Sequence, residues 1–248
     1  SDGKKTTNLK SLTKLDDARL AGTKQSSNCR LILTEGDSAK TCAISGLEII
    51  GRDFYGVFPL KGKLLNVRDA TPNQLLSNEE IKNIKQILGL KQNTIYTDTK
   101  KLRYGGILIL TDADVDGSHI KGLLINFFHY FWPDLLKIDG FIQSIATPII
   151  KAYKNSDTKK LNPEVFYTQT EYKKWCEKIG DVDKYKIKYY KGLGTSTPIE
   201  SKEYFVDFNN KLINYVWNIK NNDKLISNSK KDPYDNLDDD LDDNDENT

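Results

Sequence analysis

The feature that most constrains the fold is an apolar run at residues 106–110, which alternating aspartates at 112, 114 and 116 follow at once. Such a run is typical of a parallel strand covered on both faces. Similar runs occur at residues 30–34 and 54–58, and apolar residues at helical spacing follow the first of them over residues 38–50. Strands and helices that alternate in this way predict an α/β fold with a doubly wound parallel sheet.

The remaining periodicity predicts further elements around that sheet. Pro59 is expected to end the second strand. A helix is predicted after an N-cap at Ser77 or Asn78, and another over residues 120–132. Beyond these, strands are predicted at 141–150, 165–168 and 185–190, and helices at 171–178 and 197–218. These later elements form either an extension of the sheet or a small second lobe.

The two ends of the chain differ in composition from the middle. Residues 1–27 are polar and lack a sustained period, which predicts a lead-in with little fixed structure. Residues 221–248 are rich in Asn, Asp, Lys and Ser, which predicts a disordered, acidic low-complexity tail. The folded part is then divided into a core at 28–150 and an extension at 151–220. Because the first residue is not Met, we expect an excised piece of a longer protein.

Composition narrows the class of protein. The formal net charge of +2 averages an acidic end with a distinctly basic remainder, which suits a polyanion such as DNA. The three cysteines, Cys29, Cys42 and Cys176, form no C-x-x-C pair, which argues against a structural zinc site and a disulfide framework. No apolar run approaches the roughly 20 residues of a membrane span, and the polar start has no signal-peptide core.

Two acidic clusters follow predicted strands, at Glu35 and at residues 112–116. In α/β sheets, ligands collect at the carboxyl ends of the strands. The period of two in an extended segment would send Asp112, Asp114 and Asp116 to one side, where like charges need a cation. Oxygen ligands suit Mg²⁺, and adding Glu35 would allow two ions about 3.5–4 Å apart. The residues therefore predict a Mg²⁺-dependent phosphoryl-transfer site.

Structural alternatives exist for the same residues. Residues 112–117 match the first half of an EF-hand loop, but Leu123 stands where a bidentate Glu is required, and a strand precedes the segment. The aspartates could instead cap the helix that starts at Ile120. His119 is expected to be a hydrogen-bonded structural residue, and His129 a core residue.

Two further loops carry groups suited to nucleic acid. Lys61, Lys63 and Asn66 lie in a turn beside the same strand ends, where they could position a phosphate backbone. Two lysines in a turn are also ordinary surface chemistry. Residues 189–196 contain glycines suited to close backbone approach but lack the Walker A pattern, so an ATP loop is not expected.

Taken together, these sequence motifs resemble the Toprim domain of type II DNA topoisomerases. The resemblance covers about residues 29–208 and is carried by residues 35–39, 59–68, 111–121 and 190–196. Residues 51–56, 102–105 and 118–123 resemble the eukaryotic branch more than bacterial gyrase. The family commonly has Gln where Ala113 stands and often Arg where Lys61 stands, and neither difference touches a metal ligand. The implied fold is a Toprim (Rossmann-like) parallel sheet flanked by helices, with a C-terminal sheet/helix extension.

The resemblance also implies roles for individual residues. Glu35 and Asp112 would hold the catalytic Mg²⁺, Asp112 and Asp114 would hold a second Mg²⁺, and Asp116 is a further candidate ligand. The residues expected to contact DNA are Lys61, Lys63, Asn66 and Lys191. The residues expected to border a pocket for cleavage-poisoning drugs are Gly36, Asp37 and Lys61.

By the same resemblance, the partners are double-stranded DNA and the winged-helix domain of a second protomer, whose tyrosine attacks the phosphodiester and gives a 5′-phosphotyrosyl link. None of the thirteen tyrosines matches that nucleophile. ATP would act through a separate module, and the whole enzyme would be a nuclear homodimer without a membrane partner. We expect the isolated chain to be inactive.

Two other function classes share part of this pattern. A Toprim-type nuclease or primase would have the acidic clusters but would not require the sequence motifs at residues 59–68 and 190–196. A binding module with a vestigial acidic cluster would not respond to divalent ions.

Overall fold

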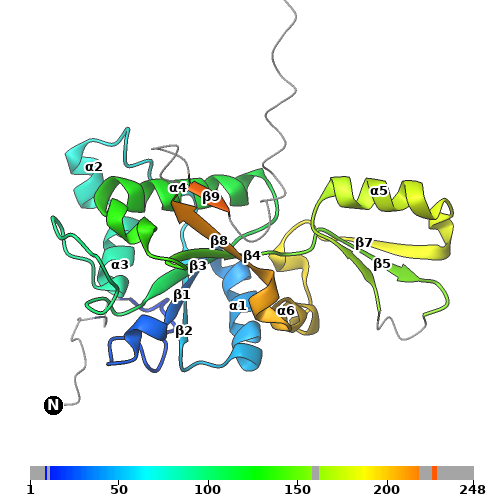
Figure 1. The fold of residues 1–248 in the computed structure, drawn as a ribbon, viewed down its shortest axis with the longest axis horizontal. Helices are drawn as coiled ribbons and strands as arrows, with labels where there is room; N and C mark the ends of the chain where they lie inside the picture. The colour runs from blue at the N-terminus through cyan, green and yellow to red at the C-terminus, as the bar shows by residue number, and fades with distance from the viewer. Residues whose placement is uncertain (1–8, 10–11, 158–161, 218–224, 228–248) are drawn as a thin grey trace, which may run out of the picture.

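The computed structural model describes residues 9, 12–157, 162–217 and 225–227, and its centre is a mixed sheet (Figure 1). Six described strands are arranged in the order β2-β1-β3-β4-β8-β9. Their bounds are β1 Arg30–Glu35, β2 Tyr55–Leu60, β3 Gly106–Leu110, β4 Ile142–Ile145, β8 Leu212–Trp217 and β9 Leu225–Ser227. β1 is parallel to β2 and β3, and β3 is parallel to β4, whereas β8 is antiparallel to both β4 and β9.

Helices cover both faces of this sheet, as the α/β prediction requires. The helices are α1 (Gly36–Ile50), α2 (Pro72–Ser77), α3 (Glu79–Leu88), α4 (Val115–Phe131) and α6 (Pro198–Phe205). Alternate strand residues point to opposite layers. Ile32 and Leu108 join the core beneath α1 and α6, whereas Leu31 and Ile107 join the core with α3 and α4. The predicted fold class is confirmed.

A smaller antiparallel sheet projects from the core (Figure 1). Its order is β6-β5-β7, with bounds β5 Ile150–Lys154, β6 Glu164–Phe166 and β7 Tyr185–Tyr189. Helix α5 (Gln169–Ile179) packs on one face, where Ile150, Ala152 and Phe166 form a small core with Trp175. We call residues 150–189 the lobe. Short 3-10 helices lie at Ser26–Asn28, Pro133–Lys137, Val182–Lys184, Leu193–Thr195 and Phe208–Lys211.

Capping residues explain where several helices begin. The side chain of Asn78 accepts a hydrogen bond from the amide of Ile81, so one of the two predicted N-caps of α3 is confirmed. α2, α5 and α6 each begin with a capping box, at Thr71, Thr168 and Thr197. The sequence prediction lacked α2, which is a short helix with Pro72 in its first turn.

The segment before β1 is part of the fold, and the prediction of little fixed structure is wrong for residues 12–27. Leu12 and Ala18 are buried. Asp16 forms an antiparallel bridge with Val57. The carboxylate of Asp17 accepts hydrogen bonds of 2.5 Å from Nη2 of Arg103 and from the hydroxyl of Tyr104. Leu15, Leu20 and Ala21 also pack against the core, so apolar and polar contacts together hold this segment, although its sequence has no sustained helix or strand period.

Three predicted boundaries are also wrong. The helix predicted over 197–218 ends at Phe205, and β8 follows because Ile213 and Tyr215 alternate into the core as strand residues do. β2 continues through Pro59, which an edge strand tolerates. The strand predicted at 141–150 is divided between β4 and β5, which belong to different sheets.

The predicted acidic tail lies outside the described residues, except for the backbone of β9, which pairs with β8. None of the helices in the described ranges has both the length and the apolar character needed to cross a bilayer.

Candidate metal and nucleic-acid site

Two carboxylates meet at the carboxyl edge of the central sheet because their strands are parallel neighbours. β1 ends at Glu35, and β3 is followed by Thr111 and Asp112. The register pairs Thr34 with Leu110, which brings the two strand ends level. Oε2 of Glu35 is buried without a hydrogen-bond partner among the described residues. A buried carboxylate oxygen of this kind is costly unless a ligand satisfies it.

At this edge, burial and the neighbouring carboxylates make ionisation of the carboxyl groups less favourable. Burial raises the pKa of Glu35, and the charges of Asp112, Asp114 and Asp116 raise it further, against a hydrogen bond from the backbone of Asp112. Burial also raises the pKa of Asp112, and the charge of Asp114 adds to this effect. A cation at the edge would reverse these shifts, since opposite charge favours the ionised carboxylates.

The three aspartates do not share one side of an extended segment, so that prediction is wrong. α4 begins at Val115, and Asp114 is its N-cap, with Oδ1 accepting a 2.8 Å hydrogen bond from the amide of Gly117. The capping alternative is therefore correct for Asp114, although the helix starts before Ile120. Asp116 lies in the first turn, where Lys63 pairs with its carboxylate at 2.6 Å.

Within the described ranges, no group of three or more His, Cys, Asp or Glu side chains is arranged so that it could hold a metal ion. A cation at the edge would therefore take further ligands from water or phosphate. That is the coordination Mg²⁺ usually has in proteins, with one or two carboxylates.

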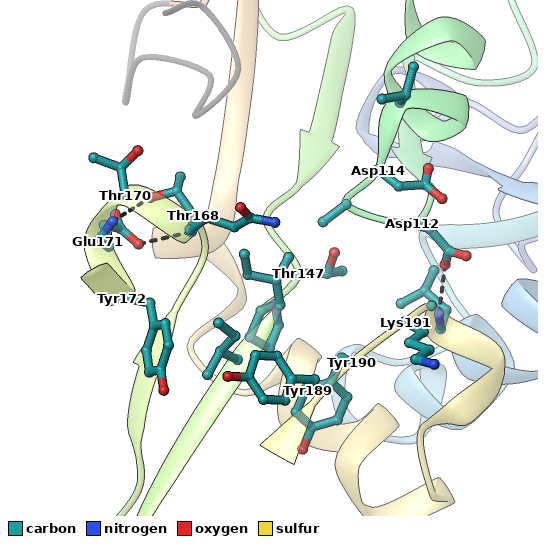
Figure 2. A pocket seen from close by; sticks show the side chains of 18 of the residues that line it. Asp112, Asp114, Thr147, Thr168, Thr170, Glu171, Tyr172, Tyr189, Tyr190 and Lys191 are labelled. Carbon is teal, nitrogen blue, oxygen red and sulfur yellow. Dashed lines mark hydrogen bonds between the residues drawn. The ribbon is translucent and has the colours of Figure 1, made fainter. Parts of the chain in front are cut away.

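A distant loop contacts Asp112 directly, which sequence reasoning missed. The amide of Leu193 donates a 2.6 Å hydrogen bond to Oδ1 of Asp112, shown as a dashed line in Figure 2. Gly192 allows this approach, because a Cβ at that position would overlap the Asp112 carboxylate. The glycines of residues 189–196 were the available signal, but nothing in the sequence identifies their neighbour.

The predicted DNA-contacting residues differ in solvent exposure and in whether the side chain already has a partner within the protein. Lys61 is exposed, and Lys63 is exposed but paired with Asp116. Asn66 is engaged within the protein, since its amide donates to Asp69 at 2.5 Å and its oxygen accepts from Asn126 at 2.8 Å.

Lys191 is exposed and lines a cleft of 1230 Å³ between the core and the lobe (Figure 2). Asp112 and Asp114 line one side of the cleft, and Tyr172 and Tyr189 the other. The cleft therefore opens onto the acidic edge of the central sheet.

Of the candidate drug-pocket residues, Gly36 and Asp37 begin α1, and Lys61 directly follows β2, whose last residue Leu60 is the register partner of Glu35. Gly36 has a φ of 75°, the left-handed region that favours glycine. Asp37 is exposed and pairs with Lys14 at 2.7 Å, and Lys40 pairs with Asp16 at 2.6 Å. Lys14 and Asp16 belong to the segment that the sequence predicted to be unstructured, so their place beside the site was missed.

The two histidines differ in their relation to the acidic edge, since the pKa of Asp116 is lowered mainly by Lys63 and to a smaller extent by the charge of His119. His119 is exposed in α4. His129 is half-buried, stacks on Trp217 with ring centroids 5.1 Å apart, and has its Nδ1 2.7 Å from Nη2 of Arg68. The prediction that His129 is a core residue is thus only partly correct.

Two family models match the chain in succession. The Toprim domain matches residues 30–145, and the C-terminal associated domain of TOPRIM matches residues 145–236. The DNA topoisomerase 2 of Acanthamoeba polyphaga mimivirus is 56% identical over 218 residues, which are 88% of this chain and 17% of the relative. DNA topoisomerase 2-alpha of Mus musculus is 50% identical over 226 residues, which are 90% of this chain and 14% of the relative.

A solved structure has the same fold. It is the crystal structure of the Plasmodium falciparum topoisomerase II DNA-binding, cleavage and re-ligation domain, which is 55% identical, with a TM-score of 0.77. The match covers 83% of this chain and 28% of that one. This chain thus spans less than a fifth of the two full-length relatives. With two successive family models matched and this fold shared, the chain belongs to the Toprim family, as a Toprim domain with its C-terminal associated domain of the DNA topoisomerase 2 type.

Proposed function

We propose that this chain is the metal-binding part of the DNA-cleaving centre of a type II topoisomerase. The whole enzyme breaks both strands of a duplex, passes a second duplex through and reseals the break, driven by ATP. The observation that carries the proposal is the buried, unpartnered Oε2 of Glu35 beside Asp112, at the strand ends of a Toprim domain.

The side chains at this edge fit Mg²⁺, because all of their donors are carboxylate oxygens. Glu35 and Asp112 would hold one ion, and Asp112 and Asp114 a second. Asp116 is the weaker candidate ligand, since Lys63 already neutralises it. Held there, the ions would supply positive charge at the attacking and leaving oxygens of the phosphodiester.

The chain's own residues prepare the site for a polyanion. Lys61 and Lys191 are exposed cations that attract and orient the phosphate backbone, and Lys63 can exchange Asp116 for a phosphate. Asn66 contributes by holding its loop against α4 through Asn126. Gly36, Asp37 and Lys61 form the border of a pocket in which cleavage-poisoning drugs bind.

The remaining parts of the reaction come from outside this chain. The nucleophile is a tyrosine in the winged-helix domain of the partner protomer, and the ATPase is a separate module. The active enzyme is a homodimer that acts in the nucleus. This chain alone binds Mg²⁺ and DNA weakly and leaves DNA uncleaved.

Metal titration of this chain tests the first part of the proposal. Binding of Mn²⁺, followed by the paramagnetic resonance signal of the free ion, should be weakened at least tenfold by Asp112→Asn. Asp53→Asn is the control, because Asp53 is exposed and precedes the amino end of β2. Binding that Asp112→Asn leaves unchanged would exclude a working site here.

Plasmid cleavage by the longer protein tests the second part. Glu35→Gln and Asp114→Asn should each abolish cleavage and relaxation of supercoiled DNA while the dimer stays folded. Normal cleavage by either variant would contradict the assigned role of that carboxylate.

A further inference from the structure

Two lysine–glutamate pairs connect the lobe to α6, on the lobe face opposite α5. Lys151 of β5 pairs with Glu203 at 2.5 Å, and Lys188 of β7 pairs with Glu200. The side chain of Lys151 is only 4% exposed, and that of Glu200 only 13%. Their partners Glu203 and Lys188 are 51% and 40% exposed, so each pair contains one buried charge, which would be costly without its partner.

The register of the small sheet explains why both pairs are needed. Lys151 and Lys188 are direct neighbours across β5 and β7. Like charges in that position repel each other, so each lysine needs its own carboxylate. The hydroxyl of Tyr190 adds a third contact, a 2.7 Å hydrogen bond to Oε1 of Glu200.

α6 is itself fixed to α1, the helix that follows Glu35. A Cβ at Gly46 of α1 would overlap the ring of Phe205, so these two elements pack in close contact. Lys202 of α6 also pairs with Glu48 of α1 at 2.6 Å. The lobe is thereby connected through α6 to α1, the helix that directly follows Glu35 of the acidic edge.

The chain passes from β7 to α6 through residues 190–197, and the amide of Leu193 in this connection binds Asp112. We propose that the Lys188–Glu200 and Lys151–Glu203 pairs are positioning pairs that hold this connection so that the Leu193 amide stays on Asp112. The alternative is that the buried side chain of Leu193, 4% exposed, anchors the connection without them.

The consequence for the metal rests on the proposed function. With Oδ1 of Asp112 bound by the Leu193 amide, the carboxylate has one orientation and Oδ2 is available to a cation. Groups that orient a ligand in this way typically contribute about 10- to 100-fold to metal affinity. Lys188 acts one step further away, so its loss should weaken binding by about tenfold or less.

Hydrogen exchange in the metal-free chain tests the positioning by itself. Lys188→Met removes the charge and keeps most of the side-chain volume, and we expect amides of residues 190–196 to exchange several-fold faster. Lys202→Met is the matched control, because it removes an α6 ion pair that faces α1 and not the lobe. Lys188→Arg should restore slow exchange. Lys151→Met is the second test variant, and circular dichroism verifies the fold of each variant.

Mn²⁺ affinity of the same variants gives a second measurement. Lys188→Met should weaken binding, whereas Lys202→Met and Lys188→Arg should not. The positioning proposal is overturned if Lys188→Met remains folded with unchanged exchange at residues 190–196. A wild-type chain that binds no Mn²⁺ would contradict the proposed function instead, while the exchange result would still decide the positioning.

Discussion

The amide of Leu193 and the carboxylate of Asp112 are joined by a 2.6 Å hydrogen bond, although 81 residues separate them in the chain. This contact lowers the pKa of Asp112, whereas burial and the charge of Asp114 raise it. The acidic edge of the central sheet is therefore completed by a loop from the C-terminal part of the chain. Neither the core nor the extension contains the whole site.

Gly192→Ala should disturb Asp112 without disturbing the backbone. Gly192 has a φ of 168°, which is extended backbone that alanine adopts freely, but the new Cβ would overlap the Asp112 carboxylate. We expect Mn²⁺ affinity to fall at least tenfold, with the unfolding midpoint changed only slightly. Titration and thermal unfolding measure the two effects separately.

Gly122→Ala is the matched control for that substitution. Gly122 is exposed in α4, and a Cβ there would meet nothing within 4 Å. Alanine at this position should stabilise the helix by about 0.5–1 kcal/mol and leave metal affinity unchanged. Equal losses of affinity in the two variants would show that the Gly192 effect is not local.

The sequence predicted the sheet and the acidic strand ends well, because apolar runs mark buried parallel strands directly. It could not predict the Leu193–Asp112 contact, since a backbone amide leaves no trace in residue type. Asp17 was missed for a related reason. Its partners Arg103 and Tyr104 are distant in the chain and polar, so no periodicity connects them.

Asp17→Ala should destabilise the whole chain, because Arg103 would keep a charge that is only 6% exposed and lose its partner. Removing one member of a buried pair typically costs about 3–5 kcal/mol, and the partial exposure of Asp17 places the loss near the lower value. Denaturant unfolding measures it. Asp53→Ala removes the exposed Arg19–Asp53 pair and should cost less than about 1 kcal/mol. Similar small losses in both variants would mean that residues 12–20 dock only weakly.

Glu200 should make the chain less stable in acid. Burial raises its pKa, but Lys188, the Thr197 amide and Tyr190 outweigh that effect and lower the pKa from 4.5 to about 2. A lowered pKa stabilises the folded state above the unfolded value, and this contribution is lost as the pH falls from about 4.5 to about 2. The unfolding free energies of wild type and Glu200→Gln should therefore differ above pH 5 and converge near pH 2. A difference that stays constant with pH would assign the effect to packing. Glu48→Gln, which removes an exposed α6–α1 pair, should show a smaller change.

Glu35→Gln should stabilise the metal-free chain and weaken its response to metal. Because burial and the neighbouring aspartates raise the pKa of Glu35, the folded state binds its proton more tightly than the unfolded state does. The folded chain therefore loses stability as the pH rises from the ordinary carboxyl range through the raised pKa, and at pH 7 the ionised group opposes folding. Glutamine removes that charge at nearly constant shape.

A thermal melt at pH 7 should show a higher midpoint for Glu35→Gln than for wild type without metal. Saturating Mg²⁺ should raise the wild-type midpoint more than the Glu35→Gln midpoint, since binding to the folded state alone stabilises it and the variant keeps only the ligands of the second ion. A Glu35→Gln midpoint that is lower without metal, or one that rises with Mg²⁺ as much as the wild-type midpoint does, would show that Glu35 serves the fold and not the ion.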